Sequence, residues 1–399
     1  MTRPRFANGL STRSDPKEAE REALENLEAG LEGRTPDLVA VFATHHLGPA
    51  LEEIGVRLAR KTGTLAVIGC TAESVIGGSR EVEGQSGLSL WAASLPGTDV
   101  RFFEVTAATD PEKGALFSTL PEVGDASRAS ILLLADPYTF PMDRYLVALN
   151  EDRSGVPAMG GMASGGAGPG QNLLFTADGI REGGAIGVVL EGDIELRSVV
   201  SQGCRPVGRP WIVTDCRQNL IGRLGGQPAL DVLMETWRSL RSEEQELMQR
   251  APFLGLAIDP NKSEFERGDF LVRAVVGIDE RERSVAVADL VRRGQTVQFL
   301  VRDADSASED LKLLMASQGG GALGTPTDPR SAGALLFSCN GRGTRMFPEP
   351  NHDISCVRSS LESEVPVAGF FAAGEIGPVG GRNFLHGLTA SVAVFRTRT

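Results

Sequence analysis

The stretch GFFAAGEIGPVGGRNFLHG, residues 369–387, combines an apolar segment with a polar loop. Its first residues, GFFAA, are typical of a buried strand, because aromatic and small apolar residues pack well on a pleated core surface. The glycine-rich part that follows carries Glu375, Arg382, Asn383 and His386 within twelve residues. Ligand sites are often built on loops that a rigid scaffold holds on both sides, so we expect this loop to contact a ligand.

The same order of elements occurs three times along the chain. In each of the ranges 37–94, 131–192 and 334–395, a buried strand is followed by a helix or helical pattern, a second strand that contains a glycine, and a third strand. The glycines of the second strands are Gly69, Gly160 and Gly369. Such self-similarity indicates duplication and a pseudo-symmetric fold.

Hydrophobic periodicity and capping residues give the expected elements. A first helix should begin at Pro16, with Asp15 as its N-cap. Strands are expected at 37–44, 64–71, 87–94, 131–136, 156–166, 184–192, 334–343, 365–375 and 388–395. Helices are expected near 47–61, 141–152, 227–248, 305–317 and 351–362.

These elements predict an α/β protein with two pseudo-symmetric halves. The many adjacent strands favour mixed, largely antiparallel sheets with helices on their outer faces. The halves should divide near residue 225, where LGGQPA separates a strand pattern from a helix pattern. The expected domains are a helical segment over 1–34, a first domain over 35–224 and a second domain over 225–399.

The composition bounds the class of protein. A net charge of −12 argues against nucleic acid and anionic membranes as partners. No run of about 18 apolar residues is present, and the N-terminus lacks the apolar core of a signal peptide. The five cysteines form no CxxC pair, which is typical of reduced thiols. We therefore expect a cytoplasmic protein that does not cross a membrane.

A turn-rich loop follows the strand of FSCNGRGTRMF, residues 337–347. Its free backbone amides could bind an anion, and an arginine here could clamp a carboxylate or phosphate. The sequence is neither a Walker A loop nor a dinucleotide fingerprint. A plain turn is the alternative to a binding loop. The residues concerned are Asn340, Gly341, Arg342 and Gly343.

Cys339, beside this loop, could be a nucleophile if His352 or His386 acted as its base. A lone cysteine at a strand end is more often a small buried hydrophobe. We take Cys70, in IGCTAE, as the counterpart of Cys339 in the first repeat. Because two repeats would not both need a nucleophile, we favour a structural or pocket-lining role and assign no catalytic residue.

The histidines offer no metal motif. His45 and His46 are adjacent and point in different directions, so they would make a poor metal pair. No HxxxH, HExxH or CxxC spacing occurs, and we expect no metal site. We expect no cofactor, but an axial haem ligand needs no local motif, and the four histidines, which also include His352 and His386, leave haem as an alternative.

Three stretches resemble the FIST family, in which a FIST N segment precedes a FIST C segment. They are IGCTAESVIGG, FSCNGRGTRMF and VAGFFAAGEIGPVGGRNFLHGLTASVAVF. The resemblance covers about residues 35–395, so 35–224 is FIST N-like and 225–399 is FIST C-like. The first half matches more loosely, because GMASGGAGPG lacks the acidic residue found at Glu375.

The resemblance implies an intracellular sensory module for small ligands, amino acids among them. In bacteria such domains occur alone or beside kinase, cyclase or methyl-accepting output domains. Some members resemble haem-binding nitric oxide sensors, and in animals the pair follows an F-box and helps to recruit substrates for ubiquitination. The 399 residues leave no segment for such an output domain, so we expect a separate signalling partner.

We therefore predict a sensory protein for a small ligand such as an amino acid. A haem-binding gas sensor, a hydrolase with a Cys339 nucleophile and a protein-interaction scaffold are the alternatives. Arg342 should bind the ligand carboxylate and Glu375 its ammonium, and both should matter less for folding because loop side chains carry little core area. The pocket is expected between the halves, lined by Cys70, Thr71, Cys339, Asn340, Gly341, Arg342, Gly343, Phe371, Glu375, Gly377, Arg382, Asn383 and His386.

Overall fold

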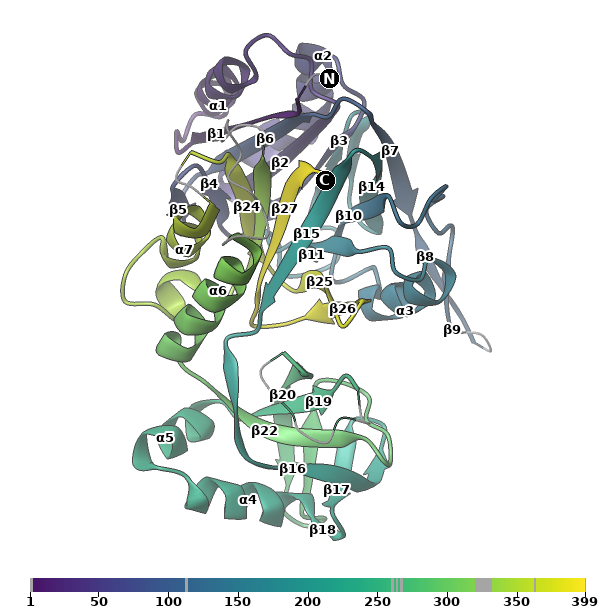
Figure 1. The fold of residues 1–399 in the computed structure, drawn as a ribbon, viewed down its shortest axis with the longest axis vertical. Coiled ribbons are helices and arrows are strands. Elements are labelled where there is room, and N and C mark those ends of the chain that lie inside the picture. The colour runs from purple at the N-terminus through teal and green to yellow at the C-terminus, as the bar shows by residue number, and fades with distance from the viewer. Residues whose placement is uncertain are drawn as a thin grey trace. The chain divides into compact units, whose positions relative to one another are not determined.

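The protein is described by a computed structural model in which the chain forms two compact units. We call residues 1–200 with 311–399 the repeat unit, and residues 201–310 the insert unit. Each unit has a hydrophobic core of its own, and Figure 1 shows the helices and strands of each. The described residues are 3–111, 114–259, 262, 265, 268–319, 332–361 and 364–398.

Three six-stranded sheets form the repeat unit. The first sheet has the order β1 (Arg5–Ser11), β6 (Leu88–Ser94), β2 (Leu38–Thr44), β3 (Val67–Ala72), β12 (Leu174–Thr176), β13 (Gly179–Arg181). The second has the order β26 (Arg382–His386), β25 (Glu375–Val379), β11 (Ala158–Met162), β10 (Ala129–Ala135), β14 (Ala185–Gly192), β7 (Thr98–Val105). The third has the order β15 (Ile194–Ser201), β27 (Ala390–Thr397), β23 (Gly333–Cys339), β24 (Val367–Ala372), β4 (Val75–Gly77), β5 (Arg80–Val82). A separate hairpin joins β8 (Ala107–Asp110) to β9 (Gly114–Phe117).

Each sheet contains one copy of the repeat that the sequence indicates. Two parallel strands lie side by side, and an antiparallel third strand pairs with the other edge of the first. The parallel pairs are β2–β3, β10–β11 and β23–β24, and the third strands are β6, β14 and β27. The internal symmetry of the repeat unit therefore has three members.

Hairpins are exchanged between these repeats. The hairpin β4–β5 follows β3 along the chain but pairs with β24 in the third sheet. In the same way β12–β13 follows β11 and pairs with β3, while β25–β26 follows β24 and pairs with β11. Each sheet is therefore completed by strands from another repeat.

A glycine in each second strand permits a close approach to the first strand. The facing pairs are Val41–Gly69, Leu133–Gly160 and Leu336–Gly369. A Cβ atom at these glycines would lie 2.0, 1.8 and 1.8 Å from the carbonyl oxygen of the facing residue. Gly160 and Gly369 also have φ of 152° and 155°, a region that side chains other than glycine rarely adopt.

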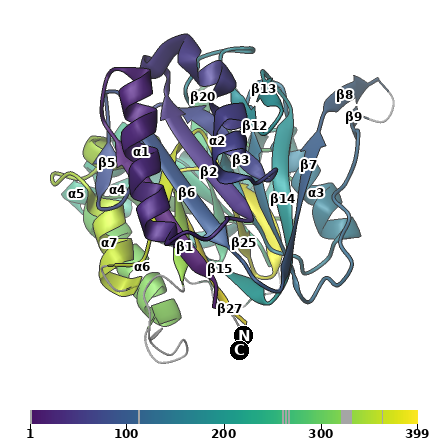
Figure 2. The ribbon, with the colours of Figure 1, turned by 90° about the horizontal axis from the view of Figure 1, so that it is seen from above.

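The inner faces of the three sheets share one core, and the outer faces carry the helices. Trp91, Leu134 and Phe370, one from each sheet, are buried in the same cluster. Each outer face packs against its helices in a separate cluster, and Figure 2 shows these helices on the outside of the sheets. The helices are α1 (Pro16–Leu31) and α2 (Ile54–Thr62) on the first sheet, α3 (Met142–Asp152) on the second, and α6 (Ala304–Gly319) and α7 (His352–Leu361) on the third.

The insert unit is built on antiparallel strands whose pairings close into a ring. The order is β16 (Cys204–Arg217), β22 (Thr296–Arg302), β19 (Phe253–Ala257), β20 (Phe270–Asp279), β21 (Ser284–Val287), β17 (Leu220–Leu224), β18 (Gln227–Pro228). Because β17 also pairs with β16, the first and sixth strands meet. Two helices, α4 (Ala229–Ser239) and α5 (Ser242–Arg250), bury Val232 and Met248 in its core.

The predicted fold class is confirmed as a mixed α/β protein with several mixed sheets and outer helices. Asp15 caps α1 as predicted, since its side chain accepts hydrogen bonds from the amides of Lys17 and Glu18 over 3.0 and 2.9 Å. The predicted N-terminal segment also contains β1, which pairs with β6. The domain boundaries at 34/35 and 224/225 stay predictions, while the compact units divide after residues 200 and 310.

Two predicted helices are interrupted. The helix expected near 47–61 is a 3-10 helix, His45–Glu53, followed by α2. Gly48 has a φ of 62° inside the first part, and Pro49 lacks an amide hydrogen. The helix expected at 227–248 is divided into α4 and α5 at Leu240, whose backbone is extended. Among the described residues, no helix is long and apolar enough to span a membrane.

Replacing a strand glycine should destabilise the protein severely. In Gly369→Ala the new Cβ would collide with the carbonyl of Leu336 at a strained φ, so we expect a loss of about 3 kcal/mol or more in the free energy of unfolding. Gly380→Ala is the matched control, because Gly380 has a φ of 58° and open space around it, and it should lose about 1–2 kcal/mol. Equal losses in urea titrations of the two variants would contradict the close approach.

Candidate functional site

The loop after β23 sends an arginine into the interior of the repeat unit. Arg342 follows the strand by three residues, and its side chain is fully buried. Its guanidinium donates to both carboxylate oxygens of Asp353, from Nε to Oδ2 over 2.6 Å and from Nη2 to Oδ1 over 2.8 Å. The planar fork of arginine matches a carboxylate in this bidentate way, so the pair is well oriented.

Asp353, in the first turn of α7, receives further hydrogen bonds. Ser338 Oγ donates to Oδ2 over 2.7 Å, and His352 Nδ1 lies 2.9 Å from Oδ1. Burial alone would raise the pKa of the Asp353 carboxyl, but the Arg342 guanidinium and these hydrogen bonds hold the pKa well below its usual range. Asp353 therefore stays a carboxylate, and Arg342 is its buried counter-ion.

Glu375, the first residue of β25, is a second fully buried acid. The amide and hydroxyl of Thr389 donate to its Oε2 over 3.0 and 2.6 Å. Burial raises the pKa of Glu375 to about 7, against the opposing effects of the Thr389 hydrogen bonds, the Arg342 charge and the Cys339 thiol. Near neutral pH Glu375 is thus divided between its acid and carboxylate forms.

Cys339, the last residue of β23, brings a thiol to the same place. Its amide donates to the carbonyl of Thr389 over 2.9 Å, so Thr389 bonds to both Cys339 and Glu375. The amide of Gly341 donates to Cys339 Sγ over 3.5 Å. Cys339 as a residue is partly exposed, so this part of the site lies near solvent.

Three buried polar atoms of this site make no hydrogen bond of ordinary geometry to the described residues: Arg342 Nη1, Glu375 Oε1 and Asn340 Oδ1. Buried polar atoms are nearly always paired, and an unsatisfied one costs about 1–3 kcal/mol. Arg342 and Glu375 interact electrostatically, so two of these atoms belong to neighbouring side chains, and Asn340 lies two residues before Arg342. We call the site the Arg342 cluster; its members are Ser338, Cys339, Asn340, Arg342, Asp353, Glu375 and Thr389.

The strand register identifies the matching residues in the other two repeats. In the first strand of each repeat, one residue faces the strand glycine. Three positions further along the chain lie Thr44, Asp136 and Cys339. In every repeat the amide of this residue donates to a carbonyl just before the third strand, over 2.9, 3.0 and 2.9 Å. The accepting residues are Gly87, Gly184 and Thr389. The shared hydrogen bond shows that the three positions are equivalent.

At four positions where the third repeat has polar residues, the first repeat has small or apolar ones. In the first repeat, Ser338, Arg342, Glu375 and Thr389 are replaced by Ala43, Leu47, Val75 and Gly87. Leu47 is buried in the outer core of the first sheet. The next residues, Gly48 and Gly343, share the backbone conformation, with φ of 62° and 58°. The fold therefore does not need an arginine at this place.

The second repeat has a polar residue, Asp136, at the position of Cys339, and both of its carboxylate oxygens accept hydrogen bonds. Asp136 accepts from Asn172 Nδ2 over 2.9 Å, from Thr139 Oγ1 over 2.7 Å and from the amide of Tyr138 over 3.2 Å. These bonds hold the loop after β10 and use both carboxylate oxygens. Only the third repeat combines buried charges with unpartnered atoms, among the described residues of these three loops.

The exchanged hairpin of the first repeat carries a third acid to this neighbourhood. Glu81 on β5 accepts a hydrogen bond at Oε1 from the amide of Ile354, in the first turn of α7, over 2.9 Å. Burial, and next the negative charge of Asp353, raise the pKa of Glu81 to about 8. At neutral pH Glu81 is therefore mostly the neutral acid, which limits its repulsion of Asp353.

The structure brings the two central predicted residues into one cluster, but one expectation is wrong. The amide of Asn340 donates to the carbonyl of Ala372 over 3.0 Å, which joins the loop after β23 to the end of β24. The expectation that the Arg342 side chain carries little buried area is wrong, because its guanidinium is fully buried and paired with Asp353. The smaller effect on folding than on binding stays a prediction. The cluster lies within the repeat unit.

Asn383, His386 and Gly377 hold the exchanged hairpin β25–β26. Asn383 Oδ1 accepts from the amide of Ala158 over 2.8 Å, and its Nδ2 donates to the carbonyl of Val156 over 2.9 Å. His386 Nε2 lies 2.9 Å from the carbonyl oxygen of Gly377. The Asn383 hydrogen bonds attach the hairpin to the second sheet, and the His386 contact joins the two strands of the hairpin. Arg382, in the same hairpin, is exposed.

Cys70 is not the counterpart of Cys339. It faces Phe42 in the strand register, as Phe370 faces Phe337, so it matches Phe370. Cys70 is fully buried in the shared core, and burial raises the pKa of its thiol well above the usual value. The sequence match is therefore wrong by one strand, because Cys70 lies on the second strand of its repeat and Cys339 on the first strand of its own.

Thr71 and Phe371, also predicted to line the pocket, lie in the same position on their two strands. Thr71 Oγ1 accepts from the amide of Leu173 over 2.9 Å and so fixes the exchanged hairpin of the second repeat. Phe371 is buried on the outer side of the third sheet, against α6 and α7. Both contribute to packing around the site.

The histidines are scattered around the repeat unit. His45 and His46 are exposed and stack on each other with ring centroids 4.2 Å apart. His352 stacks on Phe347 at 3.5 Å, beside the Arg342 cluster. In the described part of the chain, no group of three or more His, Cys, Asp or Glu side chains could hold a metal ion.

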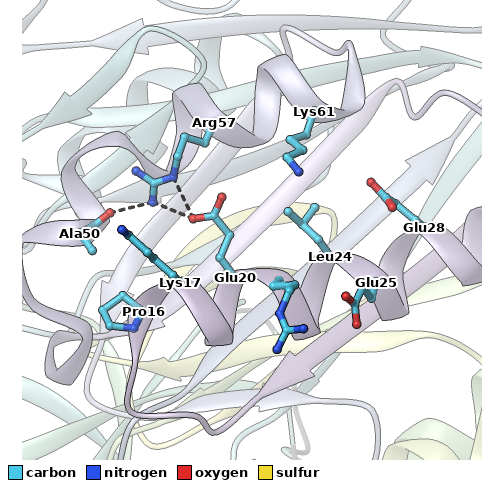
Figure 3. A pocket seen from close by; sticks show the side chains of 10 residues that line it. Pro16, Lys17, Glu20, Leu24, Glu25, Glu28, Ala50, Arg57 and Lys61 are labelled. Atoms are coloured by element: carbon cyan, nitrogen blue, oxygen red, sulfur yellow. Dashed lines mark hydrogen bonds and ion pairs between the residues drawn. The ribbon is translucent and has the colours of Figure 1, made fainter.

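A groove of about 580 Å³ lies elsewhere, between α1 and α2 (Figure 3). Arg57 bridges it by bonding to Glu20 and to the carbonyl of Ala50, both over 2.8 Å. Its walls carry charges of both signs, including Lys17 and Glu25, and contain no member of the Arg342 cluster. The groove therefore favours no single class of ligand.

Sequence reasoning missed three members of the Arg342 cluster, Ser338, Asp353 and Thr389, and the nearby Glu81. An alignment of the repeats would have indicated two of them. Ser338 and Thr389 replace alanine and glycine of both other repeats, so each is a polar exception at a buried position. Asp353 carries no such signal, since an acid in the first turn of a helix is ordinary.

Family models match most of the chain. The FIST N domain matches residues 37–227, and the FIST C domain matches residues 229–378. The uncharacterized protein Rv0628c of Mycobacterium tuberculosis is 37% identical over 391 residues, which cover 98% of this chain and 99% of the relative. The uncharacterized protein Mb0898c of Mycobacterium bovis is 37% identical over 392 residues, 98% of each chain.

Solved structures are similar only at a low level. A cyanuric acid hydrolase from A. caulinodans aligns with a TM-score of 0.33 and 9% identity, over 99% of this chain and 100% of the other. A second cyanuric acid hydrolase aligns with a TM-score of 0.29 and 10% identity, over 100% of each chain. Similarity at this level carries no inference about activity.

Removing the Asp353 carboxylate should destabilise the protein far more than removing a neighbouring side chain that donates a hydrogen bond to it. Asp353→Ala leaves the Arg342 guanidinium buried without a counter-ion, so we expect a loss of about 3–5 kcal/mol in the free energy of unfolding. Ser338→Ala removes one hydrogen bond to the same carboxylate and should lose about 1 kcal/mol. Chemical denaturation of both variants measures the difference, and a loss below 1 kcal/mol for Asp353→Ala would disprove the ion pair.

Proposed function

Because the chain belongs to the FIST family, we propose that it is a sensory protein that binds a small polar ligand at the Arg342 cluster. The observation that carries this proposal is the group of unpartnered polar atoms, Arg342 Nη1, Glu375 Oε1 and Asn340 Oδ1. The other two repeats build the same backbone without them, so the site is an addition to the fold. A ligand that pairs with these atoms would recover their desolvation cost.

The chemistry of the cluster favours an amino acid or a related metabolite. Arg342 Nη1 is a buried cationic donor, suited to a carboxylate oxygen. Glu375, when ionised, offers Oε1 to an ammonium group. A molecule that carries both groups on a small frame satisfies both atoms at once. Cys339, which is partly exposed, marks the side from which the ligand would enter.

The signal would pass to a separate output protein in the cytoplasm, and the proposal requires no cofactor. The loop after β23 contacts the exchanged hairpin of the first repeat, where the amide and hydroxyl of Thr344 donate to Glu83. Arg345 in the same loop pairs with Glu73, which follows β3. Ligand binding at Arg342 would therefore act on surface contacts between two repeats, which a partner could recognise.

Ligand discovery tests the proposal most simply. Mass spectrometry of small molecules released from natively purified protein, with thermal shift assays against the proteinogenic amino acids and their relatives, should identify a stabilising compound. At 100 times its dissociation constant a ligand adds about 2.7 kcal/mol to the free energy of unfolding. A broad library without any stabilising compound would count against the proposal.

The affinity for an ammonium-bearing ligand should depend on the protonation of Glu375. Since burial raises the pKa of Glu375 to about 7, its carboxylate form dominates above pH 7 and is lost as the pH falls. Calorimetric titration should therefore show a constant affinity above about pH 8 and a fall of up to about tenfold per pH unit below pH 7. Glu375→Gln should bind weakly without this pH dependence.

Arg382→Ala is the matched control for that titration. Arg382 is an exposed cation in the same hairpin as Glu375, so its loss changes the charge without touching the cluster. The Arg382→Ala variant should keep the wild-type affinity and pH dependence. A Glu375→Gln variant that keeps the full pH dependence would show that another group controls binding.

A further inference from the structure

The surroundings of Cys339 differ from those of the other cysteines. The guanidinium groups of Arg342 and Arg345 both interact electrostatically with Cys339. The amide of Gly341 donates to Sγ over 3.5 Å. Partial exposure with positive charges and backbone donors nearby is the environment in which a cysteine becomes a thiolate nucleophile.

A carboxyl group that can take the thiol proton is fixed beside Cys339. Thr389 accepts from the Cys339 amide through its carbonyl and donates to Glu375 Oε2 through its amide and hydroxyl. This leaves Oε1, which makes no other hydrogen bond, near the thiol. Glu375, rather than a histidine, is therefore the base available to Cys339.

Cys216 shows what an ordinary cysteine looks like in this chain. It is also partly exposed, and its thiol donates to the carbonyl of Val291 over 3.5 Å. Cys70 and Cys356 are buried, and burial raises the pKa of both thiols. Cys216 is therefore a control with comparable access but without the guanidinium and carboxyl groups of the Arg342 cluster.

We propose that Cys339 is a peroxide-reactive thiol, which hydrogen peroxide converts to a sulfenic acid inside the Arg342 cluster. The polar atoms around it are exposed by less than 1 Å², so the site as it stands admits only a very small reagent. Hydrogen peroxide meets this limit and carries an oxygen that Arg342 Nη1 can bind. The proposal concerns a covalent reaction of the ligand-free protein, because peroxide and an amino acid would use the same atoms of Arg342 and Glu375.

The reaction balances with the groups that are present. Glu375 accepts the thiol proton, and the Cys339 sulfur attacks one oxygen of hydrogen peroxide. A sulfur–oxygen bond forms while the oxygen–oxygen bond breaks, and the departing hydroxide, held by Arg342 Nη1, takes the proton back from Glu375 as water. The sulfur is oxidised by two electrons and the peroxide is reduced, so no further reagent is needed.

The test treats the folded full chain with hydrogen peroxide, and each sample is then unfolded in dimedone, which traps sulfenic acid. Peptide mass spectrometry follows labelling of each cysteine with time at pH 7. We expect Cys339 to be labelled at least roughly tenfold faster than Cys216, because a positioned general base accelerates a proton transfer by this factor or more. Equal rates at Cys339 and Cys216 would overturn the proposal.

Substitutions of Glu375 and Cys216 test whether the Glu375 carboxylate accepts the thiol proton of Cys339. Glu375→Gln should slow labelling of Cys339 roughly tenfold, whereas Cys216→Ser should leave it unchanged. If Glu375→Gln does not fold, the pH dependence of the wild type decides: the rate at Cys339 should rise with a midpoint near pH 7, where Glu375 loses its proton, and the rate at Cys216 should not follow this curve. The same pH dependence at both cysteines would remove Glu375 from the reaction and overturn the proposal.

Discussion

Every sheet of the repeat unit depends on a hairpin that belongs to another repeat. Each exchanged hairpin pairs with the second strand of another repeat, at the strand glycine. These glycines, Gly69, Gly160 and Gly369, also let the second strand lie close against the first. A single repeat cannot complete its own sheet, so the three must fold together. The exchange also brings Glu81 of the first repeat to the first turn of α7, near Asp353.

The buried Arg342–Asp353 pair costs desolvation free energy that the three repeats do not need for their fold. Removing two charges from water costs several kcal/mol per ion, and well-packed apolar residues of similar volume are often as stable. The first repeat shows the apolar solution, with Leu47 where the third has Arg342. We therefore attribute the buried charges to function, and the unpartnered atoms of Arg342 and Glu375 agree with that view.

The sequence predicted local structure well and long-range contacts poorly. Apolar runs and the strand glycines gave the three repeats, and Asp15 gave the start of α1. The Asn340–Arg342 loop and Glu375 were predicted to belong together, and the structure places them in one cluster. The hairpin exchange could not be predicted, because each hairpin pairs with a distant strand. Asp353 was missed because nothing in the helix pattern shows which side chain points inward.

The central claim is that the Arg342 cluster is kept for function and not for stability. The most direct measurement compares the free energy of unfolding of the wild type with that of a triple variant, Ser338→Ala, Arg342→Leu and Asp353→Val, in urea. The variant copies the first repeat at two positions and removes both charges of the pair. The account predicts a free energy of unfolding equal to the wild type or higher by about 1–4 kcal/mol. A loss of about 3 kcal/mol or more would contradict it and make the cluster a structural element.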